Sequence, residues 1–256
     1  MRIAPAPPAA AATVSPGAAG ATSGAAAAAR QAARPPVKRM DAVKQALLLF
    51  VHSKLTMCPD HRFAFASLGD TVSLVLPLSP SDPTVKKDFS SDAGSAVEAI
   101  QSLDASETRY AMADLTQLFK IAYQEGKRAE LQGRLLRVVL IYCRSSTKPQ
   151  HQWPIKQKNF TLDIIYLHDK PTADNCPQKV YDALVDALEH VSQYEGYILE
   201  TGQGLARILF RQTCILLSHP LQRCIQDDLD IPKPLAKKTM ATEAAQNEDV
   251  MPVSTQ

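Results

Sequence analysis

Two continuous apolar runs lie close together in the second half of the chain, and they restrict its fold more than any other feature. They are LLRVVLIYC at 135–143 and FTLDIIYLHD at 160–169. A strand that is buried on both faces reads as a continuous apolar run, whereas a strand with one wet face alternates apolar and polar residues. Both runs therefore predict strands of a sheet that helices cover on both sides.

The segments around these runs predict the covering helices. Apolar residues recur at three- and four-residue spacing, which is the pattern of a helix with one buried face. Pro177 fits the first turn of one of these helices, and Pro220 stops the last one. The predicted helices span 38–55, about 92–103, about 112–125, 176–194 and a final segment that begins at about 204.

A β-hairpin is predicted between the first two helices, with 61–68 pairing with 71–77 around a turn at Gly69 and Asp70. A further short strand is predicted at 196–202. The order helix, hairpin, two helices, two strands, helix, strand, helix is typical of a three-layer α/β sheet. The early hairpin implies one antiparallel edge strand on an otherwise parallel sheet.

Both ends of the chain differ in composition from this globular region. Sixteen of the first 34 residues are alanine, and no acidic residue precedes Asp41. We therefore predict a disordered leader at 1–36, a domain at 37–226 and a disordered polar tail at 227–256. Acid-free leaders that contain Ala, Arg and Ser also resemble organelle transit peptides, so import remains an alternative to a leader without a targeting role.

The bulk composition excludes several classes of function. The 256 residues carry a formal net charge of +2, which gives no electrostatic footprint for nucleic acid. No apolar run approaches the ~20 residues that span a bilayer, so we expect no membrane segment. The five cysteines form no C-x-x-C pair and are expected to be free thiols in a reducing compartment.

Known catalytic motifs are missing from the sequence. There is no phosphate-binding G-x-x-x-x-G-K-[ST], no G-x-S-x-G elbow and no H-E-x-x-H. Cys58 and His61 are close in sequence but have no evident orienting acid. Asp163 lies within a predicted strand. Its carboxylate is interpreted either as a buried hydrogen-bonding anchor or as a group that points outward at a sheet end. Trp153 lies in a polar loop, where it can anchor a partner or cap the local core.

The segment 207–226, RILFRQTCILLSHPLQRCIQ, and the two apolar runs resemble one family. It is the MERIT-type, von Willebrand A-like adaptor subunit of the BRISC and BRCA-A deubiquitinase complexes. The resemblance covers about 37–226, and HPLQR at the end of a long apolar helix is its sharpest element. It implies a doubly wound, von Willebrand A-like α/β sheet.

The resemblance also implies the function. The family's members are non-catalytic scaffolds, without a cofactor, of complexes whose metalloprotease subunit cleaves lysine-sixty-three-linked polyubiquitin. The main partner is an elongated subunit built from ubiquitin-conjugating-enzyme-like folds. The complexes act in the cytoplasm and, in DNA-damage signalling and repair, in the nucleus. A small α/β hydrolase or transferase of unrecognised type, using Cys58 or Asp163, is the alternative.

The chain departs from this family at its start. Von Willebrand A domains place their first strand at the centre of the sheet, and D-x-S-x-S after it begins the metal site. Nothing before Met40 is strand-like, so we expect a sheet that lacks its first central strand and binds no metal. Each unpaired buried backbone group costs about 1–3 kcal/mol. Several such groups together approach the whole free energy of unfolding of a domain, which is about 5–15 kcal/mol. We therefore expect an incomplete domain, in which the leader replaces native sequence.

The exit of the last helix is the predicted partner surface. Pro220 stops the helix, Leu221 can enter an apolar pocket, and Arg223 can make charge-assisted hydrogen bonds. The alternative is that Leu221 and its neighbour fold back onto their own domain. The predicted partner-binding residues are His219, Pro220, Leu221, Gln222, Arg223 and Trp153.

Overall fold

A computed structural model of the protein describes most of the globular region. The described residues are 38–75, 89–105, 110–154, 158–201 and 205–230. The predicted leader at 1–36 and most of the predicted tail lie outside these residues.

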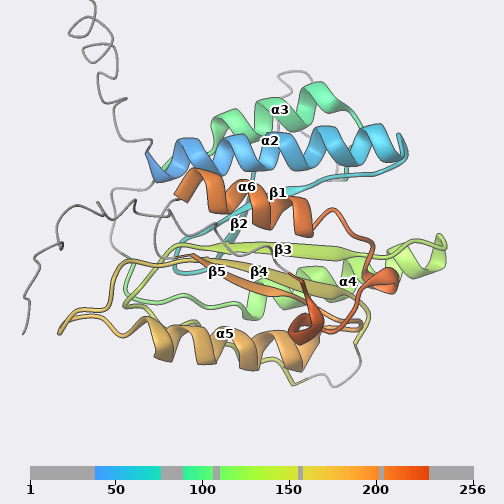
Figure 1. The fold of residues 1–256 in the computed structure, drawn as a ribbon. Helices are drawn as coiled ribbons and strands as arrows, with labels where there is room; N and C mark the ends of the chain where they lie inside the picture. The colour runs from blue at the N-terminus through green and yellow to red at the C-terminus, as the bar shows by residue number, and fades with distance from the viewer. Residues whose placement is uncertain (1–37, 76–88, 106–109, 155–157, 202–204, 231–256) are drawn as a thin grey trace, which may run out of the picture.

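A three-stranded parallel sheet forms the centre of the molecule (Figure 1). Its strands are β3 (Arg137–Tyr142), β4 (Thr161–Leu167) and β5 (Ile198–Thr201), in that spatial order. Leu140 pairs with Ile164, and Ile164 pairs in turn with Ile198. The two apolar runs are therefore adjacent parallel strands, as their sequence predicted.

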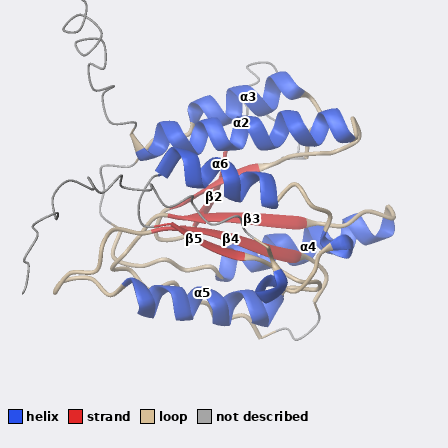
Figure 2. Ribbon diagram, viewed as in Figure 1, coloured by secondary structure: helices blue, strands red, loops and turns tan. Residues whose placement is uncertain are grey.

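The predicted hairpin is also present, but it forms a sheet of its own. Strand β1 (Phe65–Leu68) pairs antiparallel with β2 (Val72–Val75), as the secondary-structure colouring of Figure 2 shows. Among the described residues, neither strand joins the β3-β4-β5 ladder. The prediction of an antiparallel edge strand on the parallel sheet is therefore corrected to two separate sheets. Arg144 links them, since its Nη2 donates to the Leu68 and Gly69 carbonyls at 2.6 and 2.7 Å.

Helices cover both faces of the parallel sheet (Figure 1). One face carries α2 and α6, with α3 packed on α2, and the other carries α4 and α5. The resulting architecture is a mixed α/β fold in three layers. The helices are α2 (Arg39–Met57), α3 (Ala93–Ser102), α4 (Thr116–Leu131), α5 (Pro177–Val191) and α6 (Leu205–Ile215).

Helix α4 begins and ends later than its predicted range of about 112–125. The Asp114 carboxylate accepts the N–H of Thr116 at 2.8 Å, which favours a turn before the helix begins. At the other end, Gly133 has a φ of 65° and so supplies the left-handed conformation that ends many helices. The prediction used only the spacing of apolar residues. That spacing is unaffected by the Asp114 turn and by Gly133, so it could not locate the ends of the helix.

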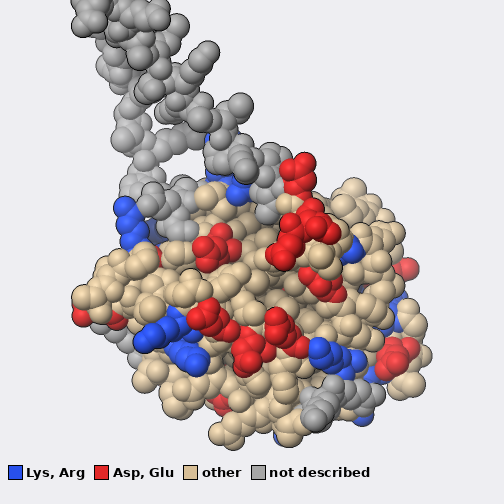
Figure 3. All heavy atoms as spheres, turned by 60° about the horizontal axis from the view of Figure 1, so that its bottom comes forward, with Lys and Arg blue, Asp and Glu red and all other residues tan. Residues whose placement is uncertain are grey.

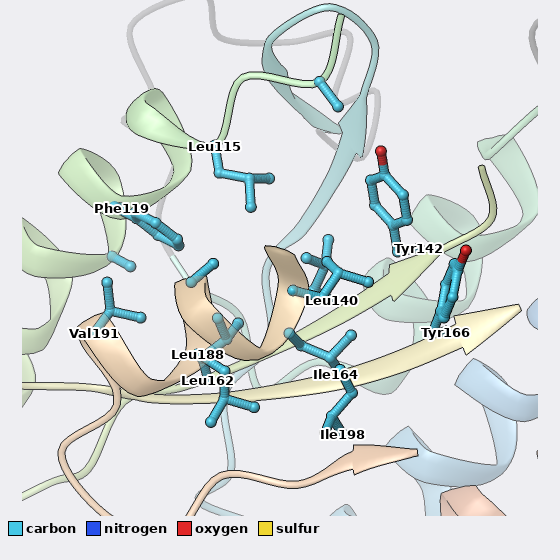
Figure 4. Close-up of a cluster of buried hydrophobic side chains, with 14 of the residues drawn as sticks. Leu115, Phe119, Leu140, Tyr142, Leu162, Ile164, Tyr166, Leu188, Val191 and Ile198 are labelled. Atoms are coloured by element: carbon cyan, nitrogen blue, oxygen red, sulfur yellow. The ribbon is translucent and has the colours of Figure 1, made fainter. Parts of the chain in front are cut away.

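Alternate residues of the strands divide the core into two layers. Leu140, Tyr142 and Ile164 point toward α4 and α5, where they join a cluster that contains Phe119 and Leu188 (Figure 4). The intervening residues of the strands face α2 and α6. Every residue of β4 is buried, as expected for the middle strand of a covered sheet.

Strand β3 is less well covered than its sequence predicted. Four of its six residues are only partly buried, although three of those four are Val138, Val139 and Ile141. Within the described ranges, β3 has β4 on one side and no strand on the other. Among the described residues, this long edge of the sheet has no strand neighbour, and it is called the open edge below.

The opposite edge of the sheet, along β5, is covered by two glutamine side chains. Gln226 accepts the N–H of Ile198 through Oε1 at 2.6 Å and donates to its carbonyl through Nε2 at 3.0 Å. Gln212 donates to the carbonyl of Glu200 at 2.8 Å. Gln226 belongs to the 3₁₀ helix η2 (Gln226–Asp228), and Leu229 packs against the core. Residues 227–230 of the predicted tail thus lie within the described part of the chain, and Leu229 is the one that packs against the core.

Two surface properties bear on membrane and nucleic-acid binding. Among the described helices, none combines the length and the apolar character that a membrane-spanning segment needs. On the face that Figure 3 turns toward the viewer, acidic and basic side chains lie interspersed among uncharged residues.

Candidate functional site

A buried carboxylate lies at the centre of the charged groups beside the sheet. Asp163 is in the middle of β4, and its side chain is completely buried. It accepts hydrogen bonds from the Nε of Arg137 and from the Tyr197 N–H at 2.9 Å. Arg223 adds Nη1–Oδ1 and Nη2–Oδ2 contacts of 2.6 and 3.2 Å. Asp163 is therefore the buried anchor that the sequence allowed, and both of its oxygens are engaged.

Arg223 is a structural residue in this fold. Its side chain has no exposed surface, and its guanidinium stacks over the Tyr197 ring with 4.5 Å between the guanidinium carbon and the ring centroid. It also donates to the Glu195 carbonyl at 3.0 Å and to Ser218 Oγ at 3.2 Å. Arg223, which the sequence analysis proposed as a partner contact, forms an internal ion pair in this structure that ties the chain after α6 to the sheet.

Basic side chains also bind carbonyls of the turn that follows α6, where the backbone has left the helix. Lys54 Nζ donates to the Leu217 carbonyl at 2.8 Å, and Arg137 Nη1 donates to that of Leu216. Burial lowers the pKa of Lys54, and the nearby guanidinium groups of Arg137 and Arg223 lower it further. These contacts join α2, β3 and the end of α6.

Arg137 has one donor left over in this arrangement. Its Nη2 is buried and has no hydrogen-bond partner among the described residues. Burial is the main cause that lowers the pKa of its guanidinium, against the opposing attraction of Asp163. An unpaired buried donor is costly, so this atom marks a place where an acceptor would be favourable.

A cavity of about 710 Å³ adjoins Arg137. Phe50 and Lys54 of α2 line one side, and Arg128 and Ala129 of α4 line another. The start of β3 forms a third part of the wall, and the chain before β1 and the 3₁₀ helix η1 (Pro220–Gln222) form the rest. The cavity therefore lies beside the open edge of the sheet.

The predicted surface after α6 borders this cavity. His219, Pro220 and Leu221 all line it. Pro220 is buried, whereas Leu221 keeps 59% of its surface exposed and Gln222 is exposed. His219 Nδ1 accepts the N–H of Leu221 at 3.3 Å, which fixes the turn. Leu221 and Gln222 therefore stand out from the domain in this structure instead of folding back onto it.

Trp153 caps the local core. Its ring meets Phe119 and Tyr123 edge-on, with ring centroids 6.5 and 5.6 Å apart. Its carbonyl oxygen lies 2.9 Å from His190 Nε2. Trp153 is packed on the α4–α5 side of the sheet and does not line the cavity. The structure thus places it apart from the other predicted residues.

The thiols show no arrangement for nucleophilic chemistry. All five cysteines are free, and Cys58 is exposed. His61 Nδ1 contacts the carbonyl oxygen of Cys58 at 2.9 Å, so the ring meets the backbone of that residue. Burial raises the pKa of the Cys143 thiol to about 11, which disfavours the thiolate.

The carboxyl ends of β3 and β4 hold an ion pair. Asp169 accepts from Arg39 Nη2 at 2.6 Å and from Ser145 Oγ at 3.3 Å. Arg39 is thus the cation that pairs with this carboxylate. In the described part of the chain, no group of three His, Cys, Asp or Glu side chains is placed to hold a metal ion. The absence of a bound metal stays a prediction.

Sequence reasoning singled out Asp163 but missed Lys54 and Arg137. A signal was available, because each apolar run contains one internal charged residue. In the observed register Val139 pairs with Asp163, so Arg137 lies two positions away on the same face. Comparison with protein-family models and with curated proteins gave no match to this sequence.

Proposed function

We propose that this protein is a non-catalytic scaffold subunit of a lysine-sixty-three-specific deubiquitinase complex of the BRISC and BRCA-A type. Its partners are the elongated ubiquitin-conjugating-like subunit and the metalloprotease subunits. In this proposal the domain is a von Willebrand A-like sheet whose first central strand is missing, and it works in the cytoplasm and the nucleus.

The likeness of 207–226 and of the two apolar strands to that family supports the proposal. The α/β architecture agrees with it, because the parallel strands β3, β4 and β5 lie between helical layers. A missing first strand would leave β3 unpaired on one side, and β3 has no second neighbour among the described residues.

The single observation that carries the proposal is the exposed turn after α6. Leu221 is 59% exposed, and Gln222 beside it is exposed as well. Their backbone is held in place by the buried Pro220 and by the Arg223–Asp163 ion pair. A large exposed apolar side chain on a rigid support gains free energy when a partner buries its surface, at about 25 cal/mol per Å².

The test is co-purification of the full chain with the deubiquitinase subunits. Leu221→Asp places a charge where the proposal puts an apolar contact, so we expect the co-purified amount to fall at least about tenfold, which corresponds to about 1.4 kcal/mol. Because Leu221 is exposed, the circular dichroism spectrum and the melting temperature should stay unchanged.

The matched control is Leu131→Asp. Leu131 is 89% exposed at the end of α4 and does not line the cavity, so this variant makes the same change at another exposed position. We expect it to co-purify normally. Arg223→Glu is unsuitable for this test, because it would bring a second carboxylate against Asp163 and unfold the domain. Normal co-purification of a folded Leu221→Asp variant would refute the proposal.

A further inference from the structure

The open edge of β3 presents backbone groups that no strand of the described ranges uses. The Thr161 N–H donates to the Leu136 carbonyl at 3.1 Å, so the backbone of Leu136 faces β4. Successive residues of a strand direct their N–H and C=O groups to opposite sides. The backbones of Arg137, Val139 and Ile141 therefore face away from β4, toward the open edge.

The cavity lies along the start of this edge. Arg137 and Val139 line it, and aromatic side chains close part of it, with Phe50 from α2 and Phe63 from the chain before β1. Its volume of about 710 Å³ is within the range of pockets that bind ligands of several hundred daltons. It can therefore take several side chains of an extended peptide.

The charge of the lining favours an acidic group in the occupant. Its basic side chains include Lys54, Arg62, Arg134 and Arg137, whereas the acidic ones are Asp60 and Glu125. A carboxylate in the cavity would lie among these cations and would accept a charge-assisted hydrogen bond from one of their side chains.

We infer that the β3 edge is an acceptor for an extended segment of a partner polypeptide, which adds to the sheet as a fourth strand. The segment carries apolar side chains at alternate positions and a carboxylate near Arg137. Chains that add to a sheet edge gain affinity from the main chain and specificity from such side-chain pockets. This inference does not depend on which complex the protein enters.

The occupant is assigned to a partner because the rest of this sequence is poorly suited to the role. The residues outside the described ranges are rich in Ala at 1–37, carry three prolines within 76–88 and are largely polar at 231–256. None of these segments has the alternating β-branched or aromatic pattern of a strand. Proline also removes the N–H that a ladder needs.

The test uses the full chain and a fluorescent peptide of about seven residues, which is a common strand length. The peptide alternates valine and threonine and ends in aspartate. We expect saturable binding with a Kd below about 1 mM, and slower hydrogen exchange at the amides of Arg137, Val139 and Ile141. The amides of Val138, Leu140 and Tyr142 already face β4 and should exchange at unchanged rates.

Two altered peptides distinguish the addition of a strand to β3 from non-specific binding to the protein surface. Methylation of alternate backbone nitrogens removes the donors on one edge of the peptide, so the version methylated on the β3-facing edge should lose at least tenfold in affinity. Replacement of the aspartate by lysine should also weaken binding, because the lining is basic. Equal affinity of all three peptides would overturn the inference.

A pair of protein variants tests the location. Ala129 lines the cavity from α4, and Gln124 is exposed on the same helix outside the cavity. Ala129→Trp occupies part of the cavity and should weaken peptide binding at least tenfold, whereas Gln124→Trp should bind as the parent does. Circular dichroism confirms that both variants fold. Parent-like affinity of a folded Ala129→Trp, or protection at amides away from β3, would contradict the proposed site.

Discussion

Asp163 shows how a single residue can set the internal design of a protein. A buried carboxylate is tolerated only with close partners, because its desolvation costs several kcal/mol. Here two guanidinium groups and one backbone N–H satisfy it. The partners come from β3, from the chain after α6 and from the start of β5, so one charge fixes three segments that are far apart in sequence.

Removing one partner should therefore be far more harmful than removing a surface ion pair. We predict that Arg223→Ala lowers the free energy of unfolding by about 3–5 kcal/mol, because it leaves Asp163 buried with one cation fewer. The control is Arg39→Ala, which breaks the exposed pair with Asp169 and should cost at most about 1 kcal/mol. Urea denaturation followed by circular dichroism measures both. Equal losses of unfolding free energy in the two variants would show that the buried ion pair stabilises the protein no more than the exposed one.

The sequence could not have assigned Arg223 to this role. Its pattern shows only that a basic residue follows the end of a helix, and such a residue is exposed in most proteins. The distance from Arg223 to Asp163 is 60 positions along the chain, and only the folded sheet brings them together. The exposure of Leu221 was easier to predict than the role of Arg223. It depends on the local turn, which Pro220 determines.

At the scale of whole elements, the sequence was a reliable guide. Each described α-helix and strand overlaps a predicted segment, because hydrophobic period and turn residues are local signals. The 3₁₀ helix η2 is the exception, since it lies where the tail was predicted to begin. The prediction that the hairpin supplies an edge strand of the parallel sheet was wrong for the opposite reason. Whether an antiparallel pair joins a larger sheet depends on long-range contacts, and the Arg144 side chain that links the two sheets through the carbonyls of Leu68 and Gly69 gives no periodic signal.

The packing of α4 leads to a prediction that reverses the usual effect of glycine. Gly126 lies in the helix interior, where alanine is normally better by about 1 kcal/mol. A Cβ at this position would lie 2.5 Å from the carbonyl oxygen of Asn159, which is backbone and cannot move cheaply. We therefore predict that Gly126→Ala destabilises the protein by about 1–3 kcal/mol.

Gly94→Ala in α3 is the matched control. Its Cβ would meet only the side-chain oxygen of Asp92, at 3.3 Å, so the change should stay within about 0.5 kcal/mol of the parent. Thermal and urea unfolding of the two variants give the comparison. A Gly126→Ala variant that is more stable than the parent would mean that α4 can shift away from the loop at Asn159.

At the scale of the whole molecule, His151 should make stability depend on pH. Its Nδ1 is buried and has no hydrogen-bond partner among the described residues, and its ring contacts Phe119 edge-on and faces His190. Burial is the main cause that lowers the pKa of His151, and the nearby His190 lowers it further, while Asp186 and Asp114 oppose this shift. The unfolded chain therefore binds a proton at His151 more readily than the folded protein does.

This sign gives a definite expectation. Stability from His151 is fully present above its unfolded pKa of 6.5 and is lost as the pH falls below that value. We predict that the unfolding free energy declines between pH 7.5 and pH 5.5, and that His151→Gln flattens this decline. Urea titrations at a series of pH values measure it. An unchanged slope in the variant would assign the decline to other groups.

The amides of Gln212 and Gln226 have a consequence for assembly. They cap β5, so any growth of the sheet is confined to β3. A continuous sheet of many copies would need two unpaired strand edges on each molecule. In its described part this molecule has one such edge, at β3, so its copies cannot pair edge to edge indefinitely. Under the inference that β3 accepts a strand, the capped β5 edge leaves one site for strand addition in each molecule, which disfavours fibre growth by repeated edge-to-edge pairing.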